Sequence, residues 1–197
     1  MVFGIMEETG LPERFVATFE KLDELVAFRE TDPVAWELRV ESLDPRDWAS
    51  WRPIRTATEP GFLDPLYAKL PARFPPLYEA LVLSYRWAEV DLQSFRLLAN
   101  PAGPDLSRLF AEIARDKGLW ESLIPSGYIQ FGKGPDMDYD PVCFDIKART
   151  KSKDCRIVKI DHEEILCNSR VKVVAELAPS FEELVLQTIE RAKSSGR

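Results

Sequence analysis

Three aspartates at alternate positions, Asp136, Asp138 and Asp140, are the residues whose type and spacing could most readily do chemistry. Carboxylates at every second position begin the calcium-binding loop of EF-hand proteins, which also requires glycine at its sixth position and glutamate at its twelfth. This chain has Pro141 and Lys147 at those two positions. The sequence therefore excludes a calcium loop of that type.

The same carboxylates could act in a looser arrangement together with Asp145. Alternation along an extended segment points Asp138 and Asp140 to the same side, where they could hold a magnesium ion or work as an acid and base pair. Acidic residues are also the ordinary chemistry of turns. The turn is the commoner explanation, and a hydrolase that uses the carboxylate cluster is kept as the third functional alternative.

Other catalytic and ligand-binding patterns are weak. The single histidine, His162, stands between acidic residues at an expected exposed turn after a strand, so no base for a serine or cysteine nucleophile is defined. Cys143, Cys155 and Cys167 lie twelve residues apart without a Cys-x-x-Cys pair, which predicts free thiols in a reducing compartment. The segment 132–134, Gly-Lys-Gly, lacks the spacing of a phosphate-binding loop. We assign no catalytic residue, no cofactor and no metal.

A basic run follows the acidic stretch. It places five positive charges within ten residues, opposed only by Asp154: Lys147, Arg149, Lys151, Lys153 and Arg156. The run lies between two predicted strands, where a hairpin turn has to be polar, and no aromatic residues interleave for base stacking. We interpret it as a solvated hairpin rather than as a phosphate site.

The composition is that of one folded domain. The chain has 197 residues, 45% hydrophobic and 11% aromatic, which suffices for a substantial core and makes several ordinary domains improbable. A net charge of -7, from 33 acidic and 26 basic residues, repels phosphate and favours basic partners, so we expect no binding to nucleic acid. No signal-peptide pattern and no long uncharged apolar run occur, which predicts a cytoplasmic location without a membrane span.

Residues 1–69 are predicted to form a helical N-terminal extension. Apolar residues at steps of three and four favour a helix from about residue 12 to residue 29, whose buried face would be Phe15, Phe19, Leu22 and Val26. Aspartate followed by proline marks two further helix starts, which bring in Trp36 and Val40 and then Trp48 and Trp51. We interpret the tryptophans as core rather than as an aromatic binding platform. A short helix over residues 62–70 ends the region.

Residues 70–193 are predicted to combine helices with strands. Pro75 and Pro76 open a helix that continues to residue 87, Asp105 caps one that ends near Gly118 and is extended over 119–124, and Ser180 caps the closing helix. Extended segments are expected at residues 89–92, 94–98, 127–132, 140–146, 156–160 and 171–175. The fold class is therefore α+β, with the sheet in the C-terminal half.

Four phrases after a helix that opens beyond Leu-Pro resemble the SUKH superfamily in their order. They are GYIQFG at 127–132, DYDPVCFD at 138–145, DHEE at 161–164 and VAELAPSFEEL at 174–184. The resemblance covers about residues 70 to 189, and the closing phrase is its most telling part. One departure is Tyr-Arg-Trp-Ala at residues 85–88, where a glycine pair commonly follows the helix.

The resemblance implies a curved, mainly antiparallel sheet backed by helices and a non-enzymatic role in binding other proteins. Many bacterial relatives are immunity proteins that neutralise a toxin domain, and fungal relatives act in cell-wall regulation. We therefore predict an immunity-like protein that occludes the active cleft of a basic toxin domain through Asp136, Asp138, Tyr139 and Asp140. The alternative is a stand-alone regulatory or small-ligand-binding module.

Overall fold

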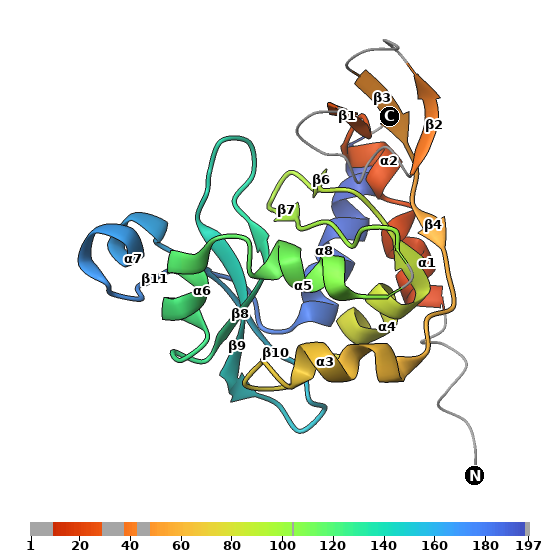
Figure 1. Ribbon diagram of the computed structural model, residues 1–197. Helices are drawn as coiled ribbons and strands as arrows, with labels where there is room; N and C mark the ends of the chain where they lie inside the picture. Colours follow the sequence, from red (N-terminus) through yellow and green to blue (C-terminus); the bar gives the residue numbers. More distant parts are fainter. Residues whose placement is uncertain (1–9, 29–37, 43–47, 104, 196–197) are drawn as a thin grey trace.

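The architecture is centred on a six-stranded antiparallel sheet. The computed structural model describes residues 10–28, 38–42, 48–103 and 105–195 (Figure 1). The strand order is β11-β10-β9-β8-β7-β6, and every neighbouring pair is antiparallel. The strands are β6 Val90–Asp91, β7 Arg96–Leu97, β8 Tyr128–Lys133, β9 Pro141–Arg149, β10 Cys155–Ile160 and β11 Val173–Ala178. The prediction of an α+β fold with a mainly antiparallel C-terminal sheet is confirmed.

Aromatic side chains fasten helices to one face of this sheet. The rings of Phe131 in β8 and Phe144 in β9 stack with centroids 4.1 Å apart, because alternation points both to the same face. Phe181 meets both rings edge-on at the start of α8 Phe181–Ser194, and Tyr78 of α4 Pro76–Ser84 lies 5.1 Å from Phe144. Phe15 of α1 Leu11–Val16 joins the same layer through Phe181. This layer is the main core.

The opposite face is covered near one edge by two short helices. These are α6 Lys117–Leu123 and α7 His162–Asn168, and α5 Ser107–Ile113 precedes them along the chain (Figure 1). Their apolar side chains form a second buried cluster with strand residues: Leu119, Leu123, Cys143, Val158, Ile160 and Ile165. The middle parts of β9 and β10 are therefore covered on both sides, which makes them a rigid base for the loops at their ends.

The N-terminal region contains part of the expected helices and also strands that we did not predict. It includes α1, α2 Phe19–Leu22, the 3-10 helix η2 Pro60–Leu63 and α3 Asp64–Tyr67. A three-stranded sheet of order β1-β3-β2 follows α2, with β1 Val26–Phe28, β2 Arg39–Ser42 and β3 Trp48–Trp51. Strand β4 Ile54–Arg55 then pairs with β5 Tyr85–Arg86. Val26, Val40, Trp48 and Trp51 therefore lie in strands, and their assignment to helices was wrong.

The first predicted helix is interrupted by its own local chemistry. The hydroxyl of Thr18 donates to the carbonyl oxygen of Phe15 at 2.6 Å, at the point where α1 ends. After Leu22 the backbone becomes extended at Asp23, and Leu25 adopts a left-handed φ of 50°. These turns direct the chain into β1. The apolar period still holds for Phe15, Phe19 and Leu22, all of which are buried.

Three further predictions concern Trp51, Gly118 and Ser180. Trp51 is 2% exposed, so it belongs to the core as interpreted, whereas Trp36 lies outside the described residues. Gly118 does not end a helix: Asp116 accepts a hydrogen bond from the N–H of Leu119 at 3.0 Å and starts α6 there. The predicted cap of the closing helix is confirmed, since Ser180 accepts from the N–H of Glu183 at 3.0 Å.

Candidate functional site

The acidic loop of residues 134–140 joins β8 to β9 and is closed by its own hydrogen bonds. The N–H of Gly134 donates to the carbonyl oxygen of Asp140 at 2.9 Å, and the N–H of Asp138 donates to that of Pro135 at 2.9 Å. A Cβ at Gly134 would overlap the carboxylate of Asp138. Only glycine therefore lets this carboxylate fold back over the loop.

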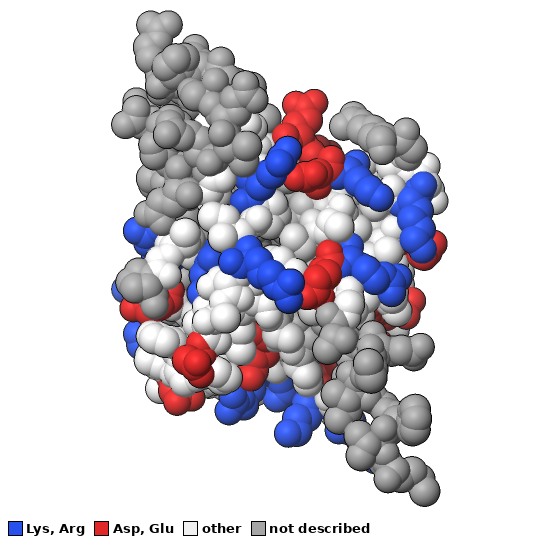
Figure 2. Space-filling view, turned by 90° about the vertical axis from the view of Figure 1, so that its right-hand side faces the viewer, with Lys and Arg blue, Asp and Glu red and all other residues white. Residues whose placement is uncertain are grey.

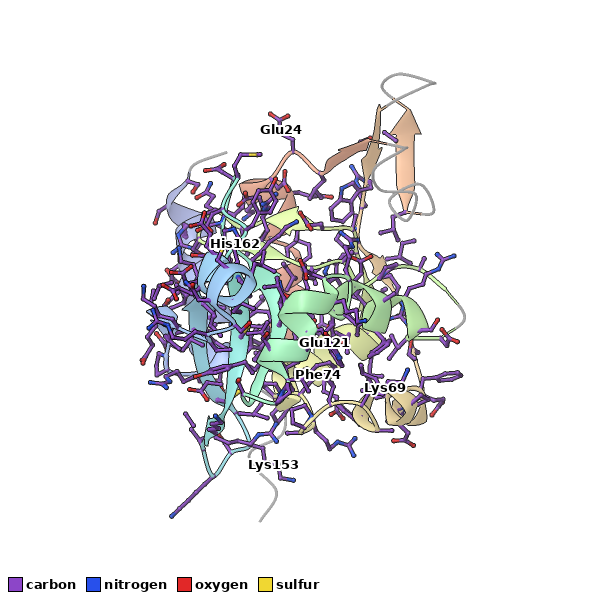
Figure 3. The ribbon with its side chains drawn as sticks, turned by 60° about the vertical axis from the view of Figure 1, so that its left-hand side comes forward. Glu24, Lys69, Phe74, Glu121, Lys153 and His162 are labelled. Atoms are coloured by element: carbon purple, nitrogen blue, oxygen red, sulfur yellow. The ribbon has the colours of Figure 1, made fainter. Side chains whose placement is uncertain are left out.

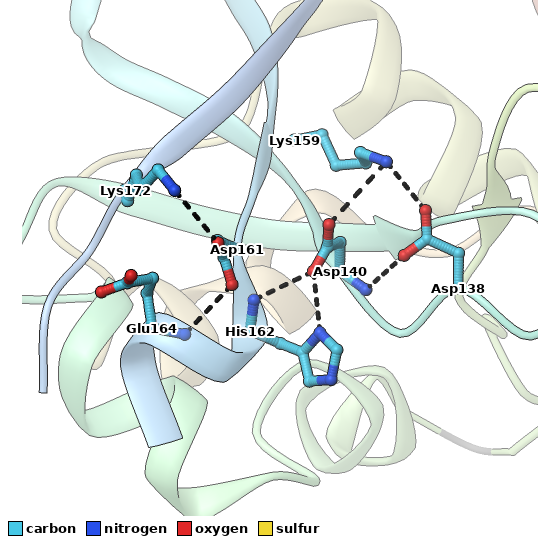
Figure 4. Close-up of polar contacts among 7 residues, drawn as sticks. All are labelled: Asp138, Asp140, Lys159, Asp161, His162, Glu164 and Lys172. Atoms are coloured by element: carbon cyan, nitrogen blue, oxygen red, sulfur yellow. Dashed lines mark hydrogen bonds and ion pairs between the residues drawn. The ribbon is translucent and has the colours of Figure 1, made fainter. Parts of the chain in front are cut away.

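Asp138 binds to a residue of the neighbouring strand β10. Its Oδ2 lies 2.8 Å from Nζ of Lys159 in β10, and its Oδ1 accepts the N–H of Asp140 at 2.9 Å (Figure 4). Partial burial raises the pKa of Asp138, but the hydrogen bonds from Lys159 and Asp140 and the charge of Lys159 outweigh it, so the pKa lies below its ordinary value. The same hydrogen bond raises the pKa of Lys159. Asp138 is thus charged, and it holds the loop against β10.

Asp140 joins the loop to the start of α7. Its Oδ1 accepts the backbone N–H of His162 at 3.0 Å and lies 2.7 Å from Nδ1 of the same residue, while its Oδ2 is 3.8 Å from Nζ of Lys159 (Figure 4). Asp161 caps α7 by accepting the N–H of Glu164 at 3.0 Å. That bond is the main reason why the pKa of Asp161 is lowered. His162 therefore begins a helix, and the prediction of an exposed turn after a strand was wrong.

Three loop residues face outward. The exposed fractions are 75% for Met137 and 51% for Tyr139, and Asp136 is exposed as well. Asp136 has a left-handed φ of 52°, and its N–H donates to Asp91 at 3.0 Å, which fixes the loop to β6. The ring of Tyr139 meets His162 edge-on with centroids 6.4 Å apart. The loop thus presents a thioether, a phenol and a carboxylate from a braced backbone.

A cavity of about 400 Å³ adjoins Tyr139. In Figure 4 the His162 ring points away from the sheet, and Nδ1 is the nitrogen that meets Asp140. Its walls come from Leu98 after β7, from the α5–α6 region, from β8, from the loop and from α7. The lining residues are Leu98, Glu112, Arg115, Asp116, Leu119, Gln130, Lys133, Tyr139, His162 and Leu166. Because Asp140 occupies Nδ1, Nε2 is the ring nitrogen that remains for a ligand in this cavity.

The structure gathers only part of the predicted carboxylate cluster. Asp138 and Asp140 do point to the same side and share Lys159, as alternation suggested. Asp145 is buried near the other end of the β8–β9 ladder, where Oδ2 lies 2.6 Å from Nη2 of Arg156. Within the described part of the chain, no three His, Cys, Asp or Glu side chains are placed to hold a metal ion. The four aspartates therefore do not form one site.

The sequence did not reveal the partners of the acidic loop. Lys159 and His162 follow Asp138 by about twenty positions, and the β9–β10 pairing of Val142 with Lys159 brings them together. A lysine that interrupts the apolar strand 156–160 was the available signal. Of the four residues that we predicted to contact a partner, Asp138 and Asp140 have internal partners, while Asp136 and Tyr139 are exposed.

No protein-family model matches the chain, and no curated protein matches it either. None of the described helices is long and apolar enough to pass through a lipid bilayer.

Proposed function

We propose that this chain is a non-enzymatic, cytoplasmic protein-binding domain of the SUKH type, and that it acts as an immunity-like protein for a cognate basic toxin domain. The observation that carries the proposal is the braced loop, which holds Met137 and Tyr139 in solvent at exposed fractions of 75% and 51%. A backbone that is already fixed loses little conformational entropy on binding, and Tyr and Met are enriched in interface centres.

The contacts within the loop narrow the set of residues that we propose for binding the partner. Asp138 and Asp140 are bound to Lys159 and His162, so their role is to position the loop. Asp136 and Tyr139 remain as contact residues, and Met137 joins them although the sequence did not single it out. Occlusion of the toxin cleft would be steric, with charge complementarity raising the rate of encounter.

Affinity capture tests the binding role. Wild type, Tyr139→Ala and Phe62→Ala are immobilised, and captured proteins are identified by mass spectrometry. Phe62 is a matched control, since it is an aromatic residue exposed to 45% on η2. We expect a basic protein that wild type and Phe62→Ala retain and Tyr139→Ala loses. Retention of the captured protein by wild type and by both variants would show that the loop is not part of the interface.

Rescue tests the immunity role separately. The captured protein is expressed in cells with and without this chain. Immunity predicts that the captured protein alone arrests growth and that co-expression of wild type, but not of Tyr139→Ala, restores it. A captured protein without toxicity would leave a binding domain and overturn the immunity assignment.

The cavity favours a second candidate, a stand-alone regulatory or small-ligand-binding module. Its volume of about 400 Å³ lies in the range of ligand sites, and His162 Nε2 adds a directed polar group. Leu166 is 55% exposed, so Leu166→Trp can cover the cavity without repacking the core. Ligand-observed NMR with a fragment mixture would show binding to wild type and not to Leu166→Trp if this candidate is right.

A further inference from the structure

The basic run between β9 and β10 has its single acidic residue turned away from it. Asp154 is buried, and its carboxylate accepts the N–H groups of Cys155 at 2.7 Å, Phe181 at 3.0 Å and Glu182 at 3.2 Å. Its carboxylate therefore serves the start of α8 and forms no ion pair with the described hairpin cations. Because Asp154 is bound to the start of α8, the interpretation of the run as a solvated hairpin is weakened.

The cations of the run separate into different places. Arg156 is bound to Asp145, and Nζ of Lys147 lies 5.8 Å from the ring centroid of Tyr128. Arg149 and Lys153 instead line a broad hollow of about 690 Å³. The other lining residues come from the segment around the start of α4: Arg73, Phe74, Pro76, Glu79, Ala80 and Leu83. Two segments that are distant in sequence thus bring three cations to one hollow.

Two of these cations are held in place before any ligand arrives. Arg149 donates from Nε to the carbonyl oxygen of Lys153 at 3.0 Å and from Nη2 to that of Arg73. Arg73 lies over the ring of Tyr67 at 4.6 Å and pairs with Glu79 at 3.3 Å. Preorganised cations lose little side-chain entropy on binding an anion.

Lys153 is presented by a closed turn. It has a left-handed φ of 66°, its N–H donates to the carbonyl oxygen of Thr150 at 3.0 Å, and the N–H of Thr150 donates to that of Asp154 at 2.7 Å. Figure 3 shows its side chain leaving the tip of the hairpin. No described residue pairs with its Nζ, so this ammonium group is available.

The charge in the hollow fits a dianion. Arg73, Arg149 and Lys153 face one carboxylate, that of Glu79, which also accepts the hydroxyl of Tyr67 at 2.6 Å. Three positive charges and one negative charge leave two positive charges. On the face in Figure 2 acidic and basic side chains are interspersed, and Lys and Arg gather at its lower margin, the end at which the β9–β10 hairpin turns in Figure 1.

We propose that this hollow is a binding site for the phosphate monoester group of a small organic molecule. Arg73, Arg149 and Lys153 bind the phosphate oxygens, and the apolar wall of Pro76, Ala80 and Leu83 receives the organic part. The net charge of -7 does not oppose this, because charges farther than about 8 Å are largely screened at physiological salt. The site is separate from the acidic loop and does not depend on its proposed function.

Titration of the full chain with phenyl phosphate and with inorganic phosphate, followed by NMR in 50 mM salt, tests the site. We expect saturable binding, at least threefold tighter for phenyl phosphate because its ring contacts the apolar wall. Lys153→Gln should weaken binding at least fivefold, and Arg149→Gln should do so as well. Lys151→Gln is the matched control, since Lys151 is exposed on the same hairpin and does not line the hollow.

Three results would overturn the proposal. They are the absence of saturable binding of either probe, an equal loss of affinity in Lys151→Gln and Lys153→Gln, and equal affinities for the two probes. Thermal unfolding of each variant establishes that it is folded. Lys153→Gln is the decisive variant because Lys153 has no described structural bond through its side chain, so its replacement leaves the hairpin intact.

Discussion

Nζ of Lys159 lies 2.8 Å from Oδ2 of Asp138, and this contact ties the outward-facing loop to the central strand β10. The two side chains are 26% and 32% exposed, so the pair is partly shielded from water. Through it the position of the loop depends on β10. The pair therefore determines how Met137 and Tyr139 are presented.

Removing the ammonium group should loosen the loop. Lys159→Met is expected to lower the free energy of unfolding by about 0.5–1 kcal/mol, typical of a partly exposed ion pair. Amide exchange of Asp138 and Asp140 should accelerate. Lys172→Met is the control: Lys172 is 50% exposed and 3.4 Å from Asp161, so its loss should cost less. If urea unfolding shows equal losses of unfolding free energy in Lys159→Met and Lys172→Met, Lys159 does not hold the loop in place.

The contribution of this pair should depend on pH at both ends of the range. The pKa of Asp138 is lowered in the folded state. Its contribution to the free energy of unfolding is therefore present above the carboxyl pKa of the unfolded chain and is lost as the pH falls through the carboxyl pKa of the folded chain. The pKa of Lys159 is raised in the folded state. Its contribution is therefore present below the amine pKa of the unfolded chain and is lost as the pH rises through the amine pKa of the folded chain. The difference in stability between wild type and Lys159→Met should therefore be greatest between these limits.

A methyl group at position 134 should displace Asp138. Gly134→Ala places a Cβ against the Asp138 carboxylate and is expected to destabilise the chain by about 1–3 kcal/mol, as overpacking does. Gly61→Ala is the control, because the nearest atom to a Cβ there is 3.9 Å away. A Gly134→Ala variant as stable as Gly61→Ala in thermal unfolding would show that the loop adapts freely.

Asp140 should matter more to stability than Asp136. Asp140→Ala removes the acceptor of the His162 N–H and the partner of its ring, which should cost about 1–3 kcal/mol. Asp136→Asn removes the exposed charge, keeps a residue type that tolerates the left-handed φ of 52°, and should change the free energy of unfolding by less than about 0.5 kcal/mol. Denaturant titrations of both variants provide the comparison, and a larger cost for Asp136→Asn would refute this division of roles.

The cysteines should differ sharply in reactivity. Burial and the charge of Asp154 raise the pKa of Cys155 to about 12, and burial also raises the pKa of the Cys143 thiol. Cys167 is exposed. With a disulfide reagent at pH 8, one thiol of the native chain should react quickly and the other two only after denaturation. Rapid reaction of all three would contradict the packing of β9 and β10.

Local signals predicted much of the fold. The closing helix was found because Ser180, Glu183 and an apolar stripe lie next to one another in sequence. The strands β1 to β3 were missed because their pairing is not local: Val26 fits a helical period, yet its partner is Ser50, and the backbone turns at Asp23 and Leu25 that separate it from α2 carry no strong residue signal. Tertiary pairing outweighed the periodicity there.

The position of the acidic loop could be predicted from the sequence, whereas the contacts of its side chains could not. The loop and its aspartates were evident from composition, and Asp136 and Tyr139 are exposed. Their contact with a partner stays a prediction. The internal use of Asp138 and Asp140 depends on Lys159 and His162, which approach only when β9 pairs with β10. Spacing along the chain carries no information about that approach.

The affinity of the captured partner for Tyr139→Ala tests the central claim most directly. Isothermal titration should give a dissociation constant at least tenfold higher than for wild type, a loss of about 1.4 kcal/mol or more, as expected for an aromatic hot spot. The control Phe62→Ala should bind as wild type does. An unchanged affinity in Tyr139→Ala, or an equal loss in Phe62→Ala, would contradict a binding role for the acidic loop.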